Sequence, residues 1–277
     1  MTPNVDELVR DASGILRTVD DPLDGVYVLF GLITLKLEDR HLEIDSWPRK
    51  ARWEEIEEAE NTQSAIERAV SALKTNQDTA DIGASLEVLG LSDISQVLRG
   101  RSSTNGGKAL VNEVLDFVKR TDVTDFEPRE LASLSDELLF VAGDMSRGGQ
   151  FFTPLSLARL IVDLITSEDS REIDSIYDPT VGSGGLLLTA HRKVAKNQNT
   201  SPLAAGQEIN ERVAAVARIN ARLHGVNADI RSGDTLRAPQ HIGETGLKQF
   251  DLVVANPPMG LKAQKRDEIS DKSPDRF

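Results

Sequence analysis

The residues best suited to chemistry lie in the second half of the chain. Asp178-Pro-Thr-Val-Gly182-Ser183-Gly184-Gly185 has the pattern of a strand end, a glycine turn and a helix start. Glycines let the backbone come close to a ligand, and a helix N-terminus offers free N–H donors. The short turn best suits an adenosyl ligand without a pyrophosphate. In that interpretation Asp178 accepts a hydrogen bond from the amino acid portion of the ligand.

Two other interpretations of the glycine turn fit less well. A dinucleotide site requires G-x-G-x-x-G, but leucine stands at the sixth place here. A hydrolase elbow requires glycine two residues before Ser183, and that place is Val181. A tight turn without a ligand remains an alternative when the segment is considered alone.

Two acidic residues lie at the ends of later strand-like segments. Glu208 is the last residue of the second such segment, 203–208, and stands 26 residues after Gly182. A carboxylate there can accept hydrogen bonds from both ribose hydroxyls of a nucleoside, although Glu208 taken singly could be a surface acid. Asp234 follows the third segment and is similarly placed to face an adenine amino group. Gly-Asp is also common turn chemistry, so this assignment has an open alternative.

The tetrapeptide Asn256-Pro257-Pro258-Met259 follows a fourth strand-like segment. The exocyclic amine of a base is a poor nucleophile because its lone pair is delocalised into the ring. The side-chain carbonyl of Asn256 and the backbone carbonyl of Pro257 could both accept from that NH₂ and make the lone pair more available. The prolines stiffen the loop and add no competing N–H donor. A strand-terminating Pro-Pro turn is the alternative.

Alternating strands and helices must position these residues. The pattern predicts strands at 173–178, 203–208, 229–232 and 250–255, and helices at 184–196 and 211–223. Thr153 followed by Pro154 predicts a further helix start, with a hydroxyl N-cap and proline at the first helical position. Such alternation implies an α/β fold with a parallel, doubly wound sheet that binds ligands at the carboxyl ends of its strands.

The first half of the chain has helical periodicity throughout. Apolar spacings of three and four predict helices at 5–16, 26–37, 53–73, 86–98, 110–118 and 128–140. The acidic run at 54–58 fits a solvated helix face better than a metal or partner site. This half by itself indicates a helical domain and no specific chemistry.

The composition limits the classes of function. The net charge is −13 with a pI near 4.8, which argues against a chain that holds DNA alone through a broad basic surface. The absence of cysteine excludes disulfides, a thiol nucleophile and cysteine-ligated zinc. No apolar run approaches the roughly 20 residues that cross a bilayer, and the N-terminus lacks a signal-peptide pattern. We therefore expect a cytoplasmic protein with no membrane partner.

Four motifs in this order, QFFTP, DPTVGSGG, GQEIN and NPPMG, resemble the M (modification) subunit of type I restriction–modification systems. The N-terminal ILRTVDDPLDGVYVLFGLITLKLEDR also resembles the helical domain of that family. The resemblance implies an S-adenosylmethionine-dependent N6-adenine DNA methyltransferase with a Rossmann-like sheet. It also implies a helical domain over 1–143 and a methyltransferase domain over 144–277. DNA, a specificity subunit and a restriction subunit are the implied partners.

The resemblance assigns roles residue by residue. It implies that Asn256 to Met259 face a flipped-out adenine, which receives the methyl group directly, with no metal or covalent intermediate. It places Ser183, Gly184 and Gly185 at the methionine end of the cofactor and Glu208 on its ribose. Together with the residues singled out above, the expected cofactor-binding set is Gln150, Phe151, Phe152, Thr153, Pro154, Leu155, Asp178, Gly182, Ser183, Gly184, Gly185, Glu208 and Asp234.

Two departures from the family pattern affect these expectations. The fourth residue of the NPPM motif is usually aromatic and stacks on the base, whereas here it is Met259, a weaker specifier of packing. The chain also stops soon after this motif, which predicts a truncated product whose sheet has an exposed edge. The alternative function is therefore a non-catalytic S-adenosylmethionine-binding or assembly module. A protein-glutamine or RNA methyltransferase would share the N-P-P loop, but QFFTP and the helical first half argue against it.

Overall fold

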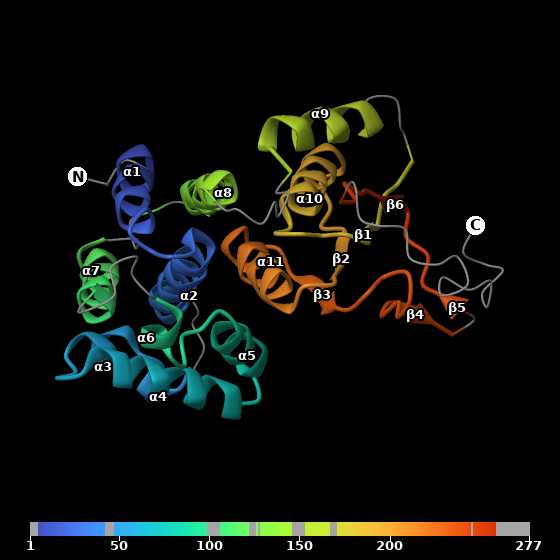
Figure 1. Cartoon of the computed structure of the whole chain (residues 1–277). Helices are drawn as coiled ribbons and strands as arrows, with labels where there is room; N and C mark the ends of the chain where they lie inside the picture. The colour runs from blue at the N-terminus through green and yellow to red at the C-terminus, as the bar shows by residue number, and fades with distance from the viewer. Residues whose placement is uncertain are drawn as a thin grey trace. The chain divides into compact units, whose positions relative to one another are not determined.

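The structure is a computed structural model of the 277-residue chain and divides into two compact units, Met1–Gln150 and Phe151–Phe277 (Figure 1). The described residues are 5–41, 47–98, 106–121, 126, 128–145, 153–166, 171–244 and 246–258. The domain boundary predicted at residues 143–144 stays a prediction. Every helix in the described ranges is too short or too polar to cross a membrane.

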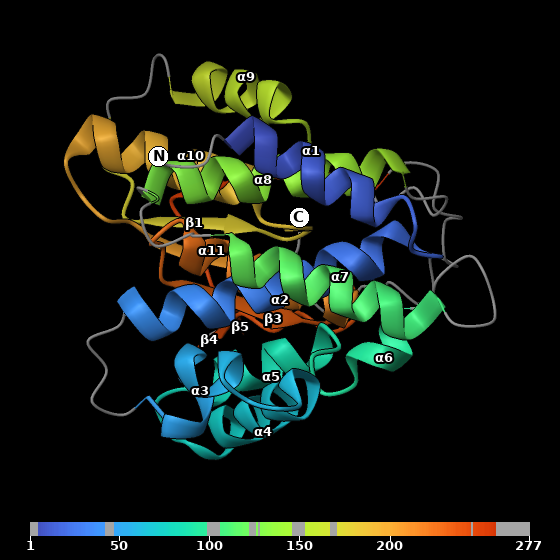
Figure 2. The same ribbon diagram turned by 90° about the vertical axis from the view of Figure 1, so that its left-hand side faces the viewer.

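Every element that the structure describes in the first unit is a helix. Its elements are α1 (Val5–Leu16), α2 (Pro22–His41), the 3₁₀ turn η1 (Arg49–Ala51), α3 (Trp53–Glu57), α4 (Thr62–Thr75), α5 (Ala80–Val88), α6 (Ile94–Val97), α7 (Gly106–Arg120) and α8 (Pro128–Met145). Helix α2 contacts α1, α3, α6, α7 and α8 (Figure 2). Its residues Val26 and Phe30 are buried, as the predicted apolar helix requires.

Two predicted helices of this unit are wrong because each one is divided. The helix predicted over 53–73 is split into α3 and α4, since Asn61 caps α4 by accepting a hydrogen bond from the Ser64 N–H at 3.0 Å. The helix predicted over 86–98 is split into α5 and α6. Gly90 lies between them with a φ of +94°, a left-handed conformation that ends the first helix.

A buried ammonium group links α2 to the end of α7. Lys36 Nζ donates to the carbonyls of Val118 (3.0 Å), Lys119 (3.1 Å) and Thr121 (2.9 Å). The last carbonyls of a helix have no partner within it, and a cation there also interacts favourably with the helix dipole. The charge of Lys36 is therefore buried without losing its hydrogen-bond partners.

The second unit contains a four-stranded parallel sheet in the order β3-β2-β1-β6, which confirms the predicted α/β class. A separate antiparallel pair, β4 and β5, was not predicted. In chain order the elements are α9 (Leu155–Thr166), β1 (Ser175–Asp178), α10 (Gly185–Gln198), β2 (Leu203–Glu208), α11 (Glu211–Leu223), β3 (Ala228–Ser232), β4 (Ile242–Gly243), β5 (Gly246–Leu247) and β6 (Leu252–Val253).

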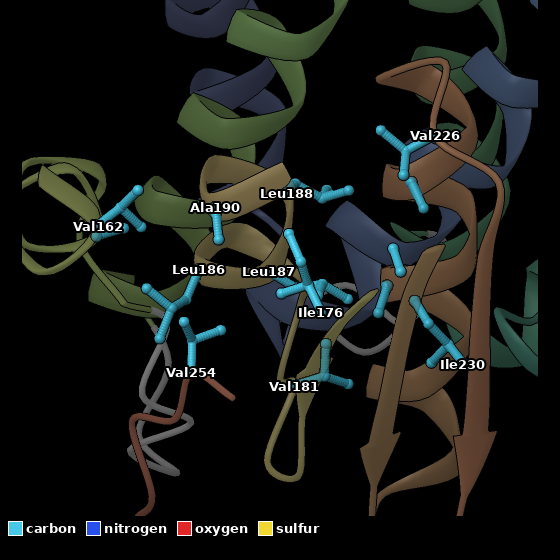
Figure 3. Packing of buried hydrophobic residues seen from close by; sticks show 14 of the residues in the cluster. Val162, Ile176, Val181, Leu186, Leu187, Leu188, Ala190, Val226, Ile230 and Val254 are labelled. Atoms are coloured by element: carbon cyan, nitrogen blue, oxygen red, sulfur yellow. The ribbon is translucent and has the colours of Figure 1, made fainter. Parts of the chain in front are cut away.

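The core of this unit lies between one face of the sheet and helices α10 and α11. Ile176 and Ala204 are paired on neighbouring strands, and both belong to the same buried cluster as Leu187 of α10 and Ala217 of α11. Figure 3 shows the α10 leucines of this cluster together with Ile176 and Val254. Helix α9 packs against α10 and adds Val162 to the cluster. The strands that lead into the candidate site residues are therefore packed against these helices.

An irregular segment covers part of the opposite face. Because neighbouring residues of a strand point to opposite faces, Tyr177 and Gln207 face away from the helices. Gln207 Nε2 donates to the Ala238 carbonyl at 3.0 Å, and its Oε1 accepts from the Gln240 N–H at 2.9 Å. The ring of Tyr177 stacks on Phe250 with 4.7 Å between centroids. Among the described residues no helix lies on this face, so this part of the chain shows one helical layer and not the two layers of the predicted doubly wound sheet.

Gly206 of β2 allows the turn after β1 to lie directly on the sheet. A Cβ atom built at Gly206 would be 2.9 Å from both the Cβ and Cγ2 atoms of Val181. The Val181 N–H donates to the Gln207 carbonyl at 3.0 Å, so the turn is also tied to β2 by its backbone. Any side chain at position 206 must displace this turn.

We expect Gly206→Ala to lower the free energy of unfolding by about 1–3 kcal/mol, the usual effect of overpacking a close contact. Thermal unfolding followed by circular dichroism measures this change. Gly14→Ala in α1 is the matched control, because a Cβ there meets no atom within 4 Å. Replacing a helical glycine should then stabilise by roughly 0.5–1 kcal/mol. Equal melting temperatures for both variants would contradict the close approach at Gly206.

Candidate active site

Four predicted site residues lie at one edge of the sheet. Asp178 and Glu208 are the last residues of β1 and β2, Asp234 follows β3, and Asn256 follows β6. All four strands are parallel, so their carboxyl ends lie at the same end of the sheet. Ligands bind at this edge in open α/β sheets, since the loops and helix N-termini gather there.

The glycine turn between β1 and α10 has the backbone that glycine allows. Gly182 and Gly184 have φ values of +55° and +91°, and Gly184 is the N-cap of α10. The Gly184 N–H donates to the Val181 carbonyl at 2.9 Å, which closes the turn. Ser183 is buried, and its carbonyl accepts a hydrogen bond from Asn220 Nδ2 at 3.0 Å. The first N–H groups of α10, from Gly185 onward, therefore point out of a fixed turn toward the edge of the sheet.

Glu208 is joined to this turn through its carboxylate. Its Oε2 atom accepts from the Gly182 N–H at 3.1 Å, and its Oε1 atom accepts from the Asn210 N–H at 2.9 Å. Its own carbonyl accepts from the Gly233 N–H at 2.8 Å. A carboxylate has about four lone-pair positions, so further hydroxyl donors can be accepted while both backbone bonds remain.

Asp178 is the buried acid of the site, because only 1% of its surface is exposed. Burial raises its pKa to about 7, although hydrogen bonds from the Thr180 N–H and hydroxyl lower it and the charge of Glu208 raises it. Burial disfavours the charged form of an acid because the protein interior solvates the carboxylate poorly. A positively charged group next to Asp178 would favour the ionised form and strengthen binding.

Asp234 makes local contacts at the edge. Its Oδ1 atom accepts from the N–H groups of Leu236 (2.9 Å) and Arg237 (3.2 Å), which is the turn chemistry given above as its alternative. The next residue, Thr235, donates its hydroxyl to the Pro179 carbonyl at 2.5 Å and so ties this turn to the one after β1. Asp234 thus lies at the predicted edge, with Oδ1 engaged in holding its own loop and Oδ2 in an ion pair with Arg237 Nε at 3.9 Å.

Thr153 and Asn256 are brought together from segments 103 residues apart. Asn256 Nδ2 donates to Thr153 Oγ1 at 3.0 Å, and both residues are half-buried. The prediction that Thr153 is the N-cap of the next helix is wrong. Helix α9 begins at Leu155, and its first bond runs from the Ala158 N–H to the Pro154 carbonyl at 2.9 Å. The start is later by one residue, and the structure assigns the Thr153 hydroxyl to Asn256.

Thr153 also lies against the glycine turn. A Cβ atom built at Gly185 would have the Thr153 carbonyl oxygen as its nearest neighbour, at 3.9 Å. Pro257 and Pro258 are exposed beyond Asn256. Of the predicted site residues, Gln150, Phe151, Phe152 and Met259 lie outside the described residues.

Two residues that help to form the site were not found from the sequence. Asn220 holds the Ser183 carbonyl from α11, and buried Gln207 holds the segment that follows β3. Asn220 had a detectable signal, since it is a polar residue in the apolar repeat of its helix. Gln207 had none, because one polar residue within a strand gives no indication of its partner.

A family model described as N-6 DNA Methylase matches residues 139–277 of this chain. The type I restriction enzyme MjaVII methylase subunit of Methanocaldococcus jannaschii is 27% identical over 79% of this chain and 36% of its own length. The HindI methylase subunit of Haemophilus influenzae is 31% identical over 48% of this chain and 29% of its own length. The chain therefore spans about a third of the length of these curated relatives.

Solved structures share the fold. The type I restriction–modification methyltransferase subunit from Streptococcus thermophilus has a TM-score of 0.59 at 22% identity, covering 92% of this chain and 63% of that chain. A modification subunit from Vibrio vulnificus has a TM-score of 0.63 at 18% identity, covering 96% and 63%. At these identities the likeness concerns the arrangement of helices and strands.

The raised pKa of Asp178 predicts a pH-dependent stability. Between pH 4 and 7 the folded chain binds a proton that the unfolded chain has lost, so this group's contribution to stability falls as the pH rises. Asp178→Asn cannot titrate at this position. Its free energy of unfolding, taken relative to that of the parent, should therefore rise by on the order of 2 kcal/mol from pH 5 to pH 8. Urea unfolding at both pH values measures the difference.

Asp229→Asn is the control of opposite sign. Burial alone would raise the pKa of Asp229, but the hydrogen bonds and charge of Arg231 outweigh it and hold the pKa below its usual value. Stability from Asp229 is thus present at neutral pH and is lost as the pH falls through that pKa. A difference between the parent and Asp178→Asn that does not change from pH 5 to 8 would contradict the burial argument.

Proposed function

The chain belongs to the N-6 DNA Methylase family, and we propose that it transfers a methyl group from S-adenosylmethionine to N6 of adenine in DNA, as the modification subunit of a type I restriction–modification system. One observation carries the proposal. Thr153 contacts both halves of the site, with its carbonyl beside Gly185 in the glycine turn and its hydroxyl bonded to Asn256. A cofactor pocket and a base pocket that share a wall are what direct transfer between two bound molecules requires.

The residues at the glycine turn fit an adenosyl cofactor. A Cβ atom built at Gly182 meets only a carbonyl oxygen at 4.0 Å, so no neighbouring side chain packs against the turn at this position. S-adenosylmethionine supplies an electrophilic methyl group on a sulfonium. In this proposal Glu208 accepts from the ribose hydroxyls, and Asp178 accepts from the amino group of the cofactor's amino acid portion. The first N–H groups of α10 face the carboxylate of that same portion of the cofactor. Asp234 faces the adenine amino group, and residues 150–155 line the pocket.

The second half of the site would prepare the target base. Asn256 Oδ1 and the Pro257 carbonyl accept hydrogen bonds from the adenine NH₂, which makes the nitrogen more tetrahedral and its lone pair more available. This lone pair forms the new N–C bond as the C–S bond of the sulfonium breaks. The neutral thioether S-adenosylhomocysteine leaves, and the proton that the nitrogen loses passes to solvent. Unstacking the base from the duplex costs a few kcal/mol, which contacts to its edge and face offset. Met259 would pack on the face of the ring as a flexible thioether.

The charge of the chain supports a division of labour with partner subunits. A net charge of −13 gives little attraction for the DNA backbone. The curated relatives are methylase subunits of multi-subunit enzymes by name. We propose that a specificity subunit reads the DNA and supplies most phosphate contacts, and that a restriction subunit completes the system. A non-catalytic assembly module is the second candidate, favoured by Met259 in place of an aromatic residue.

Cofactor affinity should rise with pH through neutrality. The positively charged ammonium in the amino acid portion of the cofactor favours ionised Asp178. Binding below pH 7 therefore requires that Asp178 lose its proton first. The dissociation constant for S-adenosylmethionine should increase about tenfold per pH unit below 7 and level off above it. Calorimetry in buffers of different ionisation enthalpy should also detect up to one proton released at pH 6.

Paired variants test the carboxylates separately. Glu208→Gln removes a charged acceptor and should weaken cofactor binding about 10- to 100-fold. Glu172→Gln makes the same change at an exposed position before β1, away from the carboxyl edge, and should leave the affinity unchanged. Equal affinities for the two variants, or no binding by the parent chain, would refute the cofactor assignment.

Methyl transfer separates the two candidate functions. With the specificity subunit present, the parent should transfer tritiated methyl groups to DNA containing the recognition sequence. Asn256→Ala should lower the rate by about 10²-fold or more, as removal of a transition-state hydrogen bond does. Its affinity for S-adenosylmethionine should stay within about twofold, because no cofactor contact is removed. Tight cofactor binding with no transfer by the parent would favour the assembly module.

A further inference from the structure

The side-chain amide of Asn256, which donates a hydrogen bond to Thr153, is an asymmetric group. An asparagine amide presents a carbonyl oxygen on one side and an NH₂ on the other, and a half-turn about χ2 exchanges them. The amine of an adenine is a donor, so it needs the oxygen. An amide turned the wrong way would bring two NH₂ groups together and leave the base without its acceptor.

Thr153 and the target amine together select one orientation of the amide through hydrogen-bond pairing. Asn256 Nδ2 donates to Thr153 Oγ1 at 3.0 Å, which leaves Oδ1 for another partner. The hydroxyl could in principle donate to a reversed amide. With a donor amine at the base position, however, every group is paired only when Nδ2 faces Thr153 and Oδ1 faces the base. An unpaired NH₂ in a half-buried site costs free energy, so this arrangement is selected.

The backbone around Thr153 holds the hydroxyl in place. Pro154 restricts the preceding residue to extended conformations, and threonine is stiff at χ1 because it is branched at Cβ. The Thr153 carbonyl lies beside the start of α10 at Gly185, and the Pro154 carbonyl receives the first bond of α9. The acceptor is therefore fixed by two helix starts, while Asn256 follows β6 directly.

We propose that Thr153 is a positioning residue for methyl transfer, which holds the Asn256 amide with its oxygen toward the target amine. This role rests on the proposed function and deepens it. The cofactor-lining role proposed for the same residue concerns its backbone carbonyl beside Gly185, which a change of side chain keeps. Loss of the hydroxyl alone should therefore slow the reaction and leave cofactor affinity unchanged.

Thr153→Val and Thr153→Ser provide the test in the complete complex with the specificity subunit. Valine keeps the shape of threonine and removes the hydroxyl, so kcat should fall about tenfold, as loss of one productive hydrogen bond does. Serine keeps the hydroxyl and should restore kcat to within about threefold. The dissociation constant for S-adenosylmethionine should stay within about twofold in both variants. Thr200→Val, at an exposed site before β2, controls for the substitution itself.

A second measurement reports the bond without activity. In chain labelled with ¹⁵N-asparagine, the Asn256 side-chain signal is identified by its loss in Asn256→Asp. Its NH₂ protons should exchange slowly with solvent in the parent and in Thr153→Ser, and about tenfold faster in Thr153→Val. Melting temperatures confirm that each variant is folded.

The outcomes separate this inference from the proposed function. An unchanged kcat in Thr153→Val, or a cofactor affinity that falls in parallel with kcat, would overturn the positioning role while methyl transfer by the parent stands. Asn256 protons that exchange equally fast in all variants would also overturn it. A parent complex that transfers no methyl group would overturn the proposed function, and the positioning role with it.

Discussion

The close approach of the glycine turn to strand β2 is the constraint on which the site depends. Val181 lies directly over Gly206 and donates to the Gln207 carbonyl, while the Gly182 N–H donates to the Glu208 carboxylate. The turn leads from β1 into α10, so fixing it on β2 also fixes the end of one strand and the start of one helix. A side chain at position 206 would disturb all three elements at once.

The same approach brings two carboxylates into one small region. Asp178 is buried and close enough to Glu208 for the two charges to interact, and its pKa is raised to about 7. Among the described residues no cation is paired with Asp178, and a buried acid without such a partner reduces the stability of a fold. The arrangement is understandable if a positively charged ligand completes it, because the ligand then removes the unfavourable term and gains affinity.

The strand order divides the edge into two regions on either side of β1. Toward β2 and β3 lie Glu208 and Asp234, and toward β6 lies Asn256. Thr153, from the segment before α9, contacts the glycine turn and Asn256. The central strand therefore separates the proposed cofactor groups from the proposed base groups, and a residue outside the sheet connects them.

Local periodicity and glycine placement predicted the α/β class, the glycine turn, the strand-end positions of Asp178 and Glu208, and the place of Asn256 after a strand. The prediction failed where one residue divided a periodic run, as Asn61 and Gly90 do. The fold was needed to show that Val181 lies over Gly206 and that the Thr153 hydroxyl accepts from Asn256 instead of capping a helix. Both contacts join segments far apart in the chain, and neighbouring residues alone carry no sign of such partners.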